Sequence, residues 1–415
     1  MKAWHRSDPH DALILKRVNY KLVEQQHQLP ELIDAVSAAS VIGFDTEFVA
    51  EDSFRPDLCL VQVSTDEHVF LVDPKAVKQL DGFWALLVDP ARKVIVHAGR
   101  EETLFVYRAT GKTMPGLFDI QLAVGILGGE YPASYGNLLN RVLGKVLDKG
   151  ETRTDWRARP LSASQLEYAA LDVLHLPQLY RVLENNLIEA RRLGWFDEEI
   201  IRRQTALIDT QLREAWHRIG GVQSMRGRQL AIVRALWQWR EQRAEQRNLP
   251  ARRVLRDDLL LEIAKRAWTE PAKIATIRGL HHPGLQRLLP ELAACVVEGL
   301  AGPEPHWPGQ RMPKRARPPA LLQQFLTAAM AYICRCNNIA TAIVGTSDDV
   351  RDLIVYWLDG GDDGGGEVPD LLLGWRGELV GQPLHDIFTG RKALRVLDPL
   401  DDMPLGLCDT SDELH

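Results

Sequence analysis

Residues 41–48 read Val-Ile-Gly-Phe-Asp-Thr-Glu-Phe, and this stretch decides how the first half of the chain folds. The apolar run from Val41 to Phe44 predicts a short buried strand. Asp45 and Glu47 follow two residues apart, a spacing that points both side chains to the same side of a strand. Two neighbouring carboxylates repel each other unless a cation lies between them, and Mg²⁺ prefers oxygen ligands. The stretch indicates either a metal site or, as the plainer alternative, a solvated acidic loop.

The composition is that of a soluble globular protein with more than one domain. The chain has 415 residues, of which 45% are hydrophobic and 26% are charged. A formal net charge of -6 excludes a uniformly basic nucleic-acid binder but not a local basic surface. The five cysteines are scattered, and no signal-like or membrane-spanning apolar run is present. We therefore expect a cytoplasmic protein without disulfides and without membrane contact.

The first half of the chain alternates strand-like and helix-like segments, which predicts a mixed α/β domain over residues 18–205 behind a leader of residues 1–17. The two strands around Thr65-Asp66-Glu67 are expected to form a hairpin. Strands are expected at 41–44, 58–63, 69–72 and 93–96, and helices at 31–39, 83–88, 101–110 and 120–127.

The second half predicts helical modules. Residues 220–302 have helical periodicity at 229–246, 259–267 and 288–300, which is typical of a compact bundle. A Pro/Gly-rich linker with a basic run covers 303–318, a mostly helical module covers 319–400, and 401–415 read as a solvated acidic tail. Between Arg226 and Arg256 there are nine arginines and two glutamates, a local charge of +7. This suits a nucleic-acid face, with solvated arginines as the alternative, while Trp237 and Trp239 are expected in the core.

Two further clusters carry residues suited to chemistry. The strand at 93–96 runs into His97-Ala98-Gly99-Arg100-Glu101-Glu102, which places acids on a first helical turn; the alternative is that they only complement the helix dipole. Tyr168 and Asp172 lie four residues apart and share one helix face, or form only a local pair. A basic and aromatic loop from Arg153 to Leu161 precedes them and suits phosphate and base contacts.

The three clusters, in this order, resemble ribonuclease D of the tyrosine subclass of the DEDD 3′–5′ exonucleases, over about residues 20 to 200. The stretch 226–300 resembles an HRDC domain, a helical nucleic-acid-binding module, and the residues beyond 319 resemble a more diverged copy. The resemblance implies an α/β ribonuclease-H-like exonuclease domain followed by all-α, HRDC-type helical modules.

The same resemblance implies the site. Asp45, Glu47, Glu102 and Asp172 are expected to be catalytic and to bind two divalent ions, Mg²⁺ or Mn²⁺, while Tyr168 orients the attacking water. The family has Asp where this chain has Glu102, so the longer side chain must adjust, and Glu101 could compete with it. The side chains expected to contact substrate are Thr46, Phe48, His97, Arg153, Trp156 and Arg159.

The implied activity is 3′–5′ trimming of tRNA precursors and other small structured RNAs, with release of nucleoside 5′-monophosphates. RNA is therefore the expected partner. A DNA exonuclease and a nucleic-acid-binding scaffold with a weakened nuclease centre are the alternatives. No nucleotide cofactor is expected, because Gly111-Lys112-Thr113 lacks the upstream glycine of a phosphate loop and has Val106 in its place.

Overall fold

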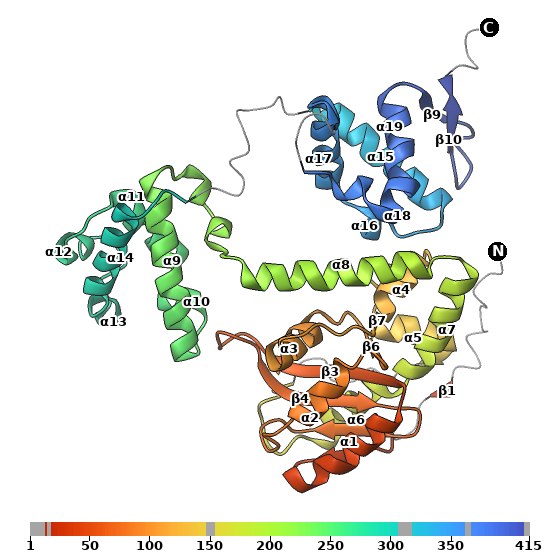
Figure 1. The fold of residues 1–415 in the computed structure, drawn as a ribbon, viewed down its shortest axis with the longest axis horizontal. Helices are drawn as coiled ribbons and strands as arrows, with labels where there is room; N and C mark the ends of the chain where they lie inside the picture. Colours follow the sequence, from red (N-terminus) through yellow and green to blue (C-terminus); the bar gives the residue numbers. More distant parts are fainter. Residues whose placement is uncertain (1–12, 15–17, 147–153, 306–317, 362–366, 411–415) are drawn as a thin grey trace.

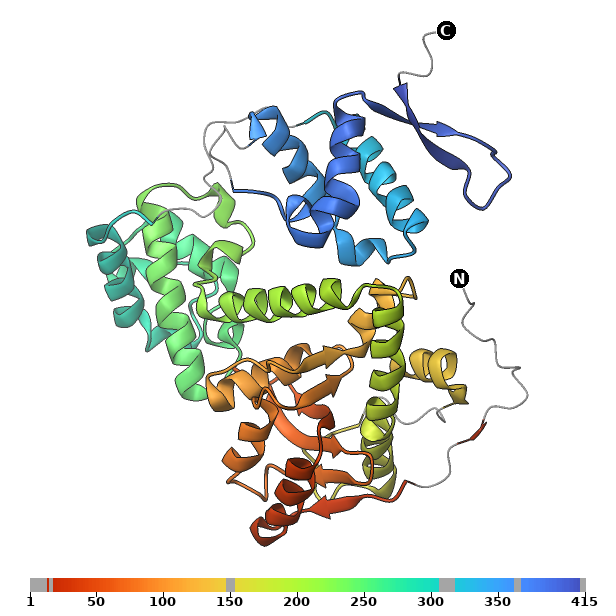
Figure 2. The same cartoon turned by 45° about the vertical axis from the view of Figure 1, so that its right-hand side comes forward.

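A computed structural model describes residues 13–14, 18–146, 154–305, 318–361 and 367–410 (Figure 1). In the ribbon, an α/β domain holds the first half of the chain, a long helix leaves it, and two helical bodies follow (Figures 1 and 2). Within the described residues, no helix is both long enough and apolar enough to cross a membrane.

The α/β domain is built on a six-stranded sheet with the strand order β2-β5-β4-β3-β6-β7. Its interior strand β3 pairs antiparallel with β4 and parallel with β6. The predicted strand at 41–44 continues to Val49, because β4 pairs with it as far as Asp57, so Asp45 and Glu47 lie inside the strand. The strands are β2 (Lys21–Val23), β3 (Val41–Val49), β4 (Asp57–Ser64), β5 (Val69–Val72), β6 (Lys93–Val96) and β7 (Leu117–Asp119).

Helix α6 (Ala163–Leu174) packs against β3, β4 and β5. It starts at a capping box in which Ser162 and Gln165 exchange hydrogen bonds, and its Ala169 and Ala170 are fully buried. Close approach also needs Gly43, since a Cβ there would lie 2.2 Å from the Ser64 hydroxyl. The other helices of the domain are α1 (Leu29–Ala38), α2 (Asp81–Leu87), α3 (Arg100–Thr110), α4 (Ile120–Ile126), α5 (Tyr135–Leu143) and α7 (Leu176–Glu189).

Part of the predicted leader is ordered against the domain. Leu13–Ile14 (β1) pairs in parallel with Lys145–Val146 (β8).

Helix α8 (Leu193–Leu212) carries the C-terminal module. Its Glu199 is fully buried and forms a 2.7 Å ion pair with the buried Arg376. The apolar core of the α/β domain continues into this module, so the two share one packed interior. The helices of the module are α15 (Ala320–Cys336), α16 (Thr341–Val344), α17 (Ser347–Leu358), α18 (Gly374–Arg376) and α19 (Gln382–Phe388).

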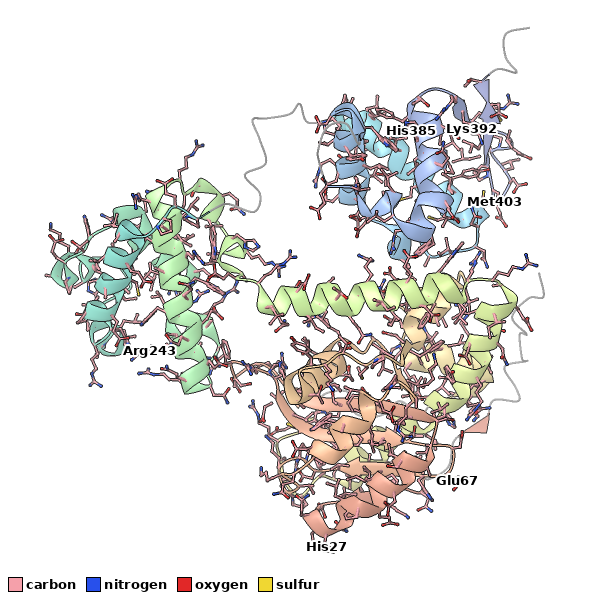
Figure 3. All side chains as sticks on the ribbon, in the orientation of Figure 1. His27, Glu67, Arg243, His385, Lys392 and Met403 are labelled. Carbon is pink, nitrogen blue, oxygen red and sulfur yellow. The ribbon has the colours of Figure 1, made fainter. Side chains whose placement is uncertain are left out.

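The C-terminal segment differs from the expectation of helices followed by a solvated tail. Lys392–Val396 (β9) and Leu405–Asp409 (β10) form an antiparallel hairpin, so part of the predicted acidic tail is a strand. Figure 3 labels Lys392 at the start of β9 and Met403 in the connection between the two strands. The alternation of Leu394, Val396, Leu405 and Leu407 is a strand signal that the nearby acidic residues obscured.

Residues 228–301 form a separate helical body with its own apolar core. Trp237 and Trp239 are half-buried and pack against this core, as expected. Many of its arginines form ion pairs, which lowers the free positive charge below the +7 of the sequence; Arg243 (Figure 3), for example, pairs with Glu291. The helices are α9 (Arg228–Arg247), α10 (Ala251–Val254), α11 (Asp257–Arg266), α12 (Pro271–Ile274), α13 (Pro283–Gln286) and α14 (Leu289–Ala301).

This body touches the α/β domain beside the loop that follows β3. Arg253 pairs with Asp52 at 2.7 Å, and the backbone N–H of Phe54 donates to the Asn248 side chain at 3.3 Å. Arg55 also pairs with Glu245. The helical body therefore rests on the segment that leaves the acidic strand.

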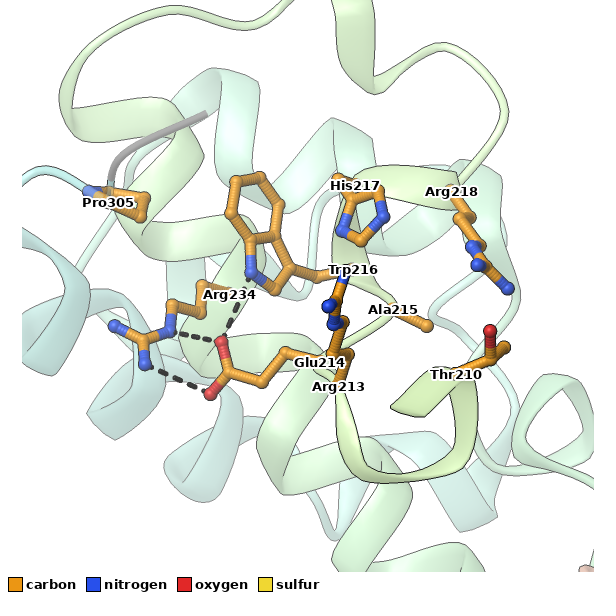
Figure 4. Close-up of a pocket in the computed structure, with 9 residues that line it drawn as sticks. All are labelled: Thr210, Arg213, Glu214, Ala215, Trp216, His217, Arg218, Arg234 and Pro305. Carbon is orange, nitrogen blue, oxygen red and sulfur yellow. Dashed lines mark hydrogen bonds and ion pairs between the residues drawn. The ribbon is translucent and has the colours of Figure 1, made fainter. Parts of the chain in front are cut away.

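The junction between α8 and α9 encloses a pocket of about 450 Å³ (Figure 4). Glu214 lies at its centre and accepts hydrogen bonds from Arg234 at 2.6 and 3.0 Å and from the Trp216 indole at 3.2 Å. These bonds brace the junction, because they tie the end of the long helix to α9. Together with the contact at Asp52, they hold the helical body at two points.

Candidate active site

The three sequence clusters converge around β3. Asp45 and Glu47 lie on the strand, Glu102 lies on the first turn of α3, and Asp172 lies on α6, which covers the strand. Burial raises the pKa of Asp45 well above its ordinary value, and the neighbouring charges of Glu102 and Asp172 raise it further. Glu102 and Asp172 are therefore close enough to Asp45 and Glu47 to oppose the ionisation of those two acids.

The other three acids have raised pKa values as well. Burial, followed by the charges of Asp172 and Glu102, raises the pKa of Glu47 to about 8. Burial raises the pKa of Glu102 to about 7 and that of Asp172 to about 7, although a hydrogen bond to each favours its charged form. A divalent cation would relieve this repulsion, and four carboxylates suit a hard cation. The donor set therefore fits the metal site expected from the sequence.

Glu102, not Glu101, is the acid turned toward this cluster. Its side chain is buried, and its carboxylate accepts a 2.5 Å hydrogen bond from the Thr46 hydroxyl. Glu101 instead pairs with Arg100. Thr46, expected to contact substrate, is 5% exposed and supports Glu102 from within the protein.

The carboxylates are not already arranged around one point. Among the residues that the structure describes, no three His, Cys, Asp or Glu side chains form a ready-made metal cage. The hydrogen bond between Thr46 and Glu102 contributes, because it directs the longer side chain toward the hydroxyl. We therefore expect cation binding to rotate some of these side chains.

Tyr168 completes the cluster from α6. Burial, with the charge of Asp172, raises the pKa of its hydroxyl above the usual value, and the two side chains are hydrogen-bonded. The indole of Trp156 lies 6.3 Å away, centroid to centroid. Tyr168 is therefore a neutral hydroxyl held beside a carboxylate, and Trp156, expected to contact substrate, is 8% exposed and supports it.

Arg159, expected to contact substrate, is engaged by protein groups in this structure. Its guanidinium binds both oxygens of Asp73, at 2.6 and 3.0 Å, and donates to the backbone carbonyls of Trp156 and Cys59. These bonds use its donors to hold the loop before α6. The predicted Arg153 lies outside the described residues.

The two remaining predicted substrate contacts lie near the cluster. The His97 Nε2 is 2.9 Å from the Ala133 carbonyl, so this imidazole is engaged by backbone. Phe48 is half-buried and meets Phe105 edge to face with a centroid distance of 5.8 Å. Phe48 directly follows Glu47 at the end of the acidic segment.

Tyr135 is a site residue that sequence reasoning missed. Burial and the charges of Asp172 and Asp45 raise its pKa, and its hydroxyl donates to the Leu171 carbonyl at 3.4 Å. It thereby supports α6 directly before Asp172. No local pattern distinguishes a lone tyrosine at a helix start, so only the fold could reveal it.

Comparisons with known proteins identify the family and the domains of this chain. Residues 20–188 match the 3′–5′ exonuclease family model, and residues 229–296 match the HRDC domain model. Ribonuclease D of Sphingobium indicum is 32% identical, with 91% of this chain and 96% of that protein covered. Ribonuclease D of Pseudomonas paraeruginosa is 33% identical, with 83% and 90% covered.

A solved structure supports the same fold. Escherichia coli RNase D, described as an exoribonuclease involved in structured RNA processing, matches with a TM-score of 0.76 at 25% identity, over 90% of this chain and 99% of that one. The match includes the helical bodies, which confirms the expected order of an α/β domain and helical modules. This fold implies dependence on a divalent metal. The matches favour RNA cleavage over the DNA exonuclease and scaffold alternatives, and the chain belongs to the ribonuclease D family of 3′–5′ exoribonucleases.

Proposed function

We propose that this protein trims the 3′ ends of tRNA precursors and other small structured RNAs in the cytoplasm and releases nucleoside 5′-monophosphates. The observation that carries the proposal is the convergence of Asp45, Glu47, Glu102 and Asp172, each with a raised pKa. The arrangement matches a centre that is completed by cations. Structured RNA enters the proposal from the described role of the Escherichia coli relative.

In this proposal, the four carboxylates hold two divalent ions, Mg²⁺ or Mn²⁺. When bound, such ions neutralise the charge that develops on the scissile phosphate and on the leaving 3′ oxygen. Tyr168 positions the attacking water through its hydroxyl. Its raised pKa keeps that hydroxyl protonated at neutral pH, so it orients the water and does not remove its proton. Phe48, at the end of the acidic segment, stacks on the terminal base.

The helical modules are proposed to span residues 220–302 and 319–400. They bind RNA at sites outside the active centre. The junction pocket (Figure 4) supports this role, because Glu214 is already paired with Arg234 while Arg218 has no ion pair within the described residues. Free guanidinium groups bind phosphates without regard to sequence. A family acting on varied small RNAs needs this kind of contact.

A gel assay tests the proposal. A 5′-labelled single-stranded RNA, the equivalent DNA and a tRNA with a 3′ extension are each incubated with Mg²⁺, Mn²⁺ or EDTA. The expected result is a metal-dependent ladder shortening from the 3′ end of RNA, lost in Asp45→Ala. Equal cleavage of DNA would support the DNA exonuclease, and RNA binding without degradation would support the scaffold. Degradation by Asp45→Ala would overturn the site assignment.

A further inference from the structure

Gln62 is a buried amide without a partner. It lies on β4, its side chain is 0% exposed, and neither its nitrogen nor its oxygen has a hydrogen-bond partner within the described residues. Burying an unpaired amide is costly, and most buried polar groups are paired. Leu60, two residues back along the strand and on the same face, is apolar and fully buried, so an apolar residue would also suit this position. An amide at this place therefore needs an explanation.

The position of Gln62 in the sheet points to that explanation. Gln62 pairs with Asp45 across the antiparallel β3–β4 ladder. Directly paired residues project to the same face, with Cβ atoms about 5 Å apart. That face lies under α6, since the Ser64 hydroxyl, two residues along β4, donates to the Val173 carbonyl at 2.6 Å. The free amide therefore lies in the layer between Asp45 and the helix that carries Asp172.

The Asp45 carboxylate also has unused hydrogen-bonding capacity. The hydrogen bond that favours its charged form comes from the Thr46 backbone, and no described side chain donates to its carboxylate. A carboxylate accepts several hydrogen bonds, and an amide supplies two N–H donors. The two groups face each other from adjacent strands, and each has unused hydrogen-bonding capacity.

We infer that Gln62 is a positioning residue of the active centre: its amide N–H donates to Asp45 and holds that carboxylate in the orientation that binds a divalent cation. This inference rests on the proposed metal site. A rotation of the Gln62 side chain forms this bond when the cation binds. The amide oxygen remains free to accept from a water molecule in the same buried layer. Hydrogen-bond partners of this kind fix metal ligands in place.

The test is Gln62→Met in the full-length protein, because methionine has a similar length and no hydrogen-bonding amide. Calorimetric titration with Mn²⁺ measures metal affinity without any need for turnover. The expected loss is at least about tenfold. The thermal midpoint in EDTA is expected to stay equal or to rise, since an unpaired buried amide is removed. Unchanged Mn²⁺ affinity in Gln62→Met would overturn the inference.

Gln204→Met is the matched control. Gln204 is also buried, but both of its amide atoms are paired with the Met114 backbone at 3.1 Å. Its substitution should lower the thermal midpoint and leave Mn²⁺ affinity unchanged. Should Gln62→Met not fold, Gln62→Asn keeps the amide but shortens its reach and should show the same loss of affinity; wild-type affinity in that variant would overturn the inference.

Metal titrations of the wild type and two variants distinguish a wrong metal site from a wrong role for Gln62. If the wild type binds no Mn²⁺, or if Asp45→Asn binds it as well as the wild type, the proposed metal site is wrong. If the wild type binds Mn²⁺, Asp45→Asn does not, and Gln62→Met binds normally, only the role of Gln62 is wrong.

Discussion

The Thr46 hydroxyl donates a 2.5 Å hydrogen bond to Glu102, and both side chains are buried. Thr46 follows Asp45 on β3, so this bond ties the first turn of α3 to the acidic strand. It also accounts for a glutamate at a position where the resemblance leads us to expect aspartate: the extra methylene reaches the hydroxyl. An aspartate would lose that reach and remain nearer its own helix.

The first prediction concerns this residue. Glu102→Asp should keep or raise the turnover of labelled RNA with Mg²⁺, because the shorter carboxylate is not directed toward Thr46. Glu102→Ala should lose most activity, by about 100-fold or more, as expected for loss of a group that acts in the transition state. Glu101→Ala is the control and should stay active, since Glu101 pairs with Arg100. The reverse result, with Glu101 essential and Glu102 dispensable, would exchange their roles.

The second prediction links pH, metal and stability. The folded-state pKa values of Glu47, Glu102 and Asp172 are raised to between about 7 and about 8, above their ordinary values. At a pH between the ordinary and the raised pKa values, the folded state holds more protons than the unfolded state. The free energy of unfolding therefore falls as pH rises through this range. In EDTA, the thermal midpoint should therefore fall from pH 5 to pH 8, because these buried acids lose their protons over this range.

Divalent cations should reverse that loss, because they bind the native state and compete with protons. The midpoint increase produced by Mg²⁺ or Mn²⁺ should be larger at pH 8 than at pH 5. Differential scanning fluorimetry measures both series, and Asp45→Asn is the control that should lack the increase. An equal increase at both pH values would mean that the cations bind elsewhere.

Each part of the proposed catalytic constellation has a local pattern in the sequence. Asp45 and Glu47 show strand spacing, Tyr168 and Asp172 show helix spacing, and the three clusters occur in the family order. The fold class follows for the same reason, since α and β periodicities differ and the resemblance supplies the order of domains.

Long-range contacts are what the sequence does not reveal. Arg159 has the charge of a phosphate ligand, but its partner Asp73 lies far along the chain, so only the structure shows that it is engaged. The same holds for Tyr135 beside α6 and for Gln62 opposite Asp45. The second strand of the C-terminal hairpin was obscured by flanking acidic residues that indicate solvation.

The third prediction concerns the joint between α8 and the C-terminal module. Glu199 is fully buried and binds Arg202, Arg203 and Arg376, and these partners lower its pKa to about 2. Arg376→Met should lower the free energy of unfolding by about 3 kcal/mol, since it removes one partner from a buried ion pair. Urea unfolding at pH 7 measures the change. Arg351→Met, at an exposed pair with Asp348, is the control and should cost less than about 1 kcal/mol.

The ionisation of Glu199 should also make stability depend on pH, with a sign opposite to that expected for the active centre. A lowered folded-state pKa means that the stabilisation from Glu199 is complete above its unfolded value near 4.5 and is lost as pH falls toward about 2. The stability difference between the wild type and Glu199→Gln should therefore shrink as the pH is lowered from 5 to 3. A difference that stays constant over this range would show that folding does not shift the pKa of Glu199.

The final prediction concerns the contact between the helical body of residues 228–301 and the loop after β3. Arg55 and Glu245 are both exposed, so their ion pair contributes at most about 1 kcal/mol, but reversing one charge adds repulsion at the contact. Arg55→Glu should open the contact at low salt and increase the radius of gyration measured by small-angle X-ray scattering. The double variant Arg55→Glu with Glu245→Arg should restore the wild-type value. Arg252→Glu is the control, because Arg252 pairs with Asp257 inside the helical body. An unrestored double variant would mean that this ion pair does not hold the two bodies together.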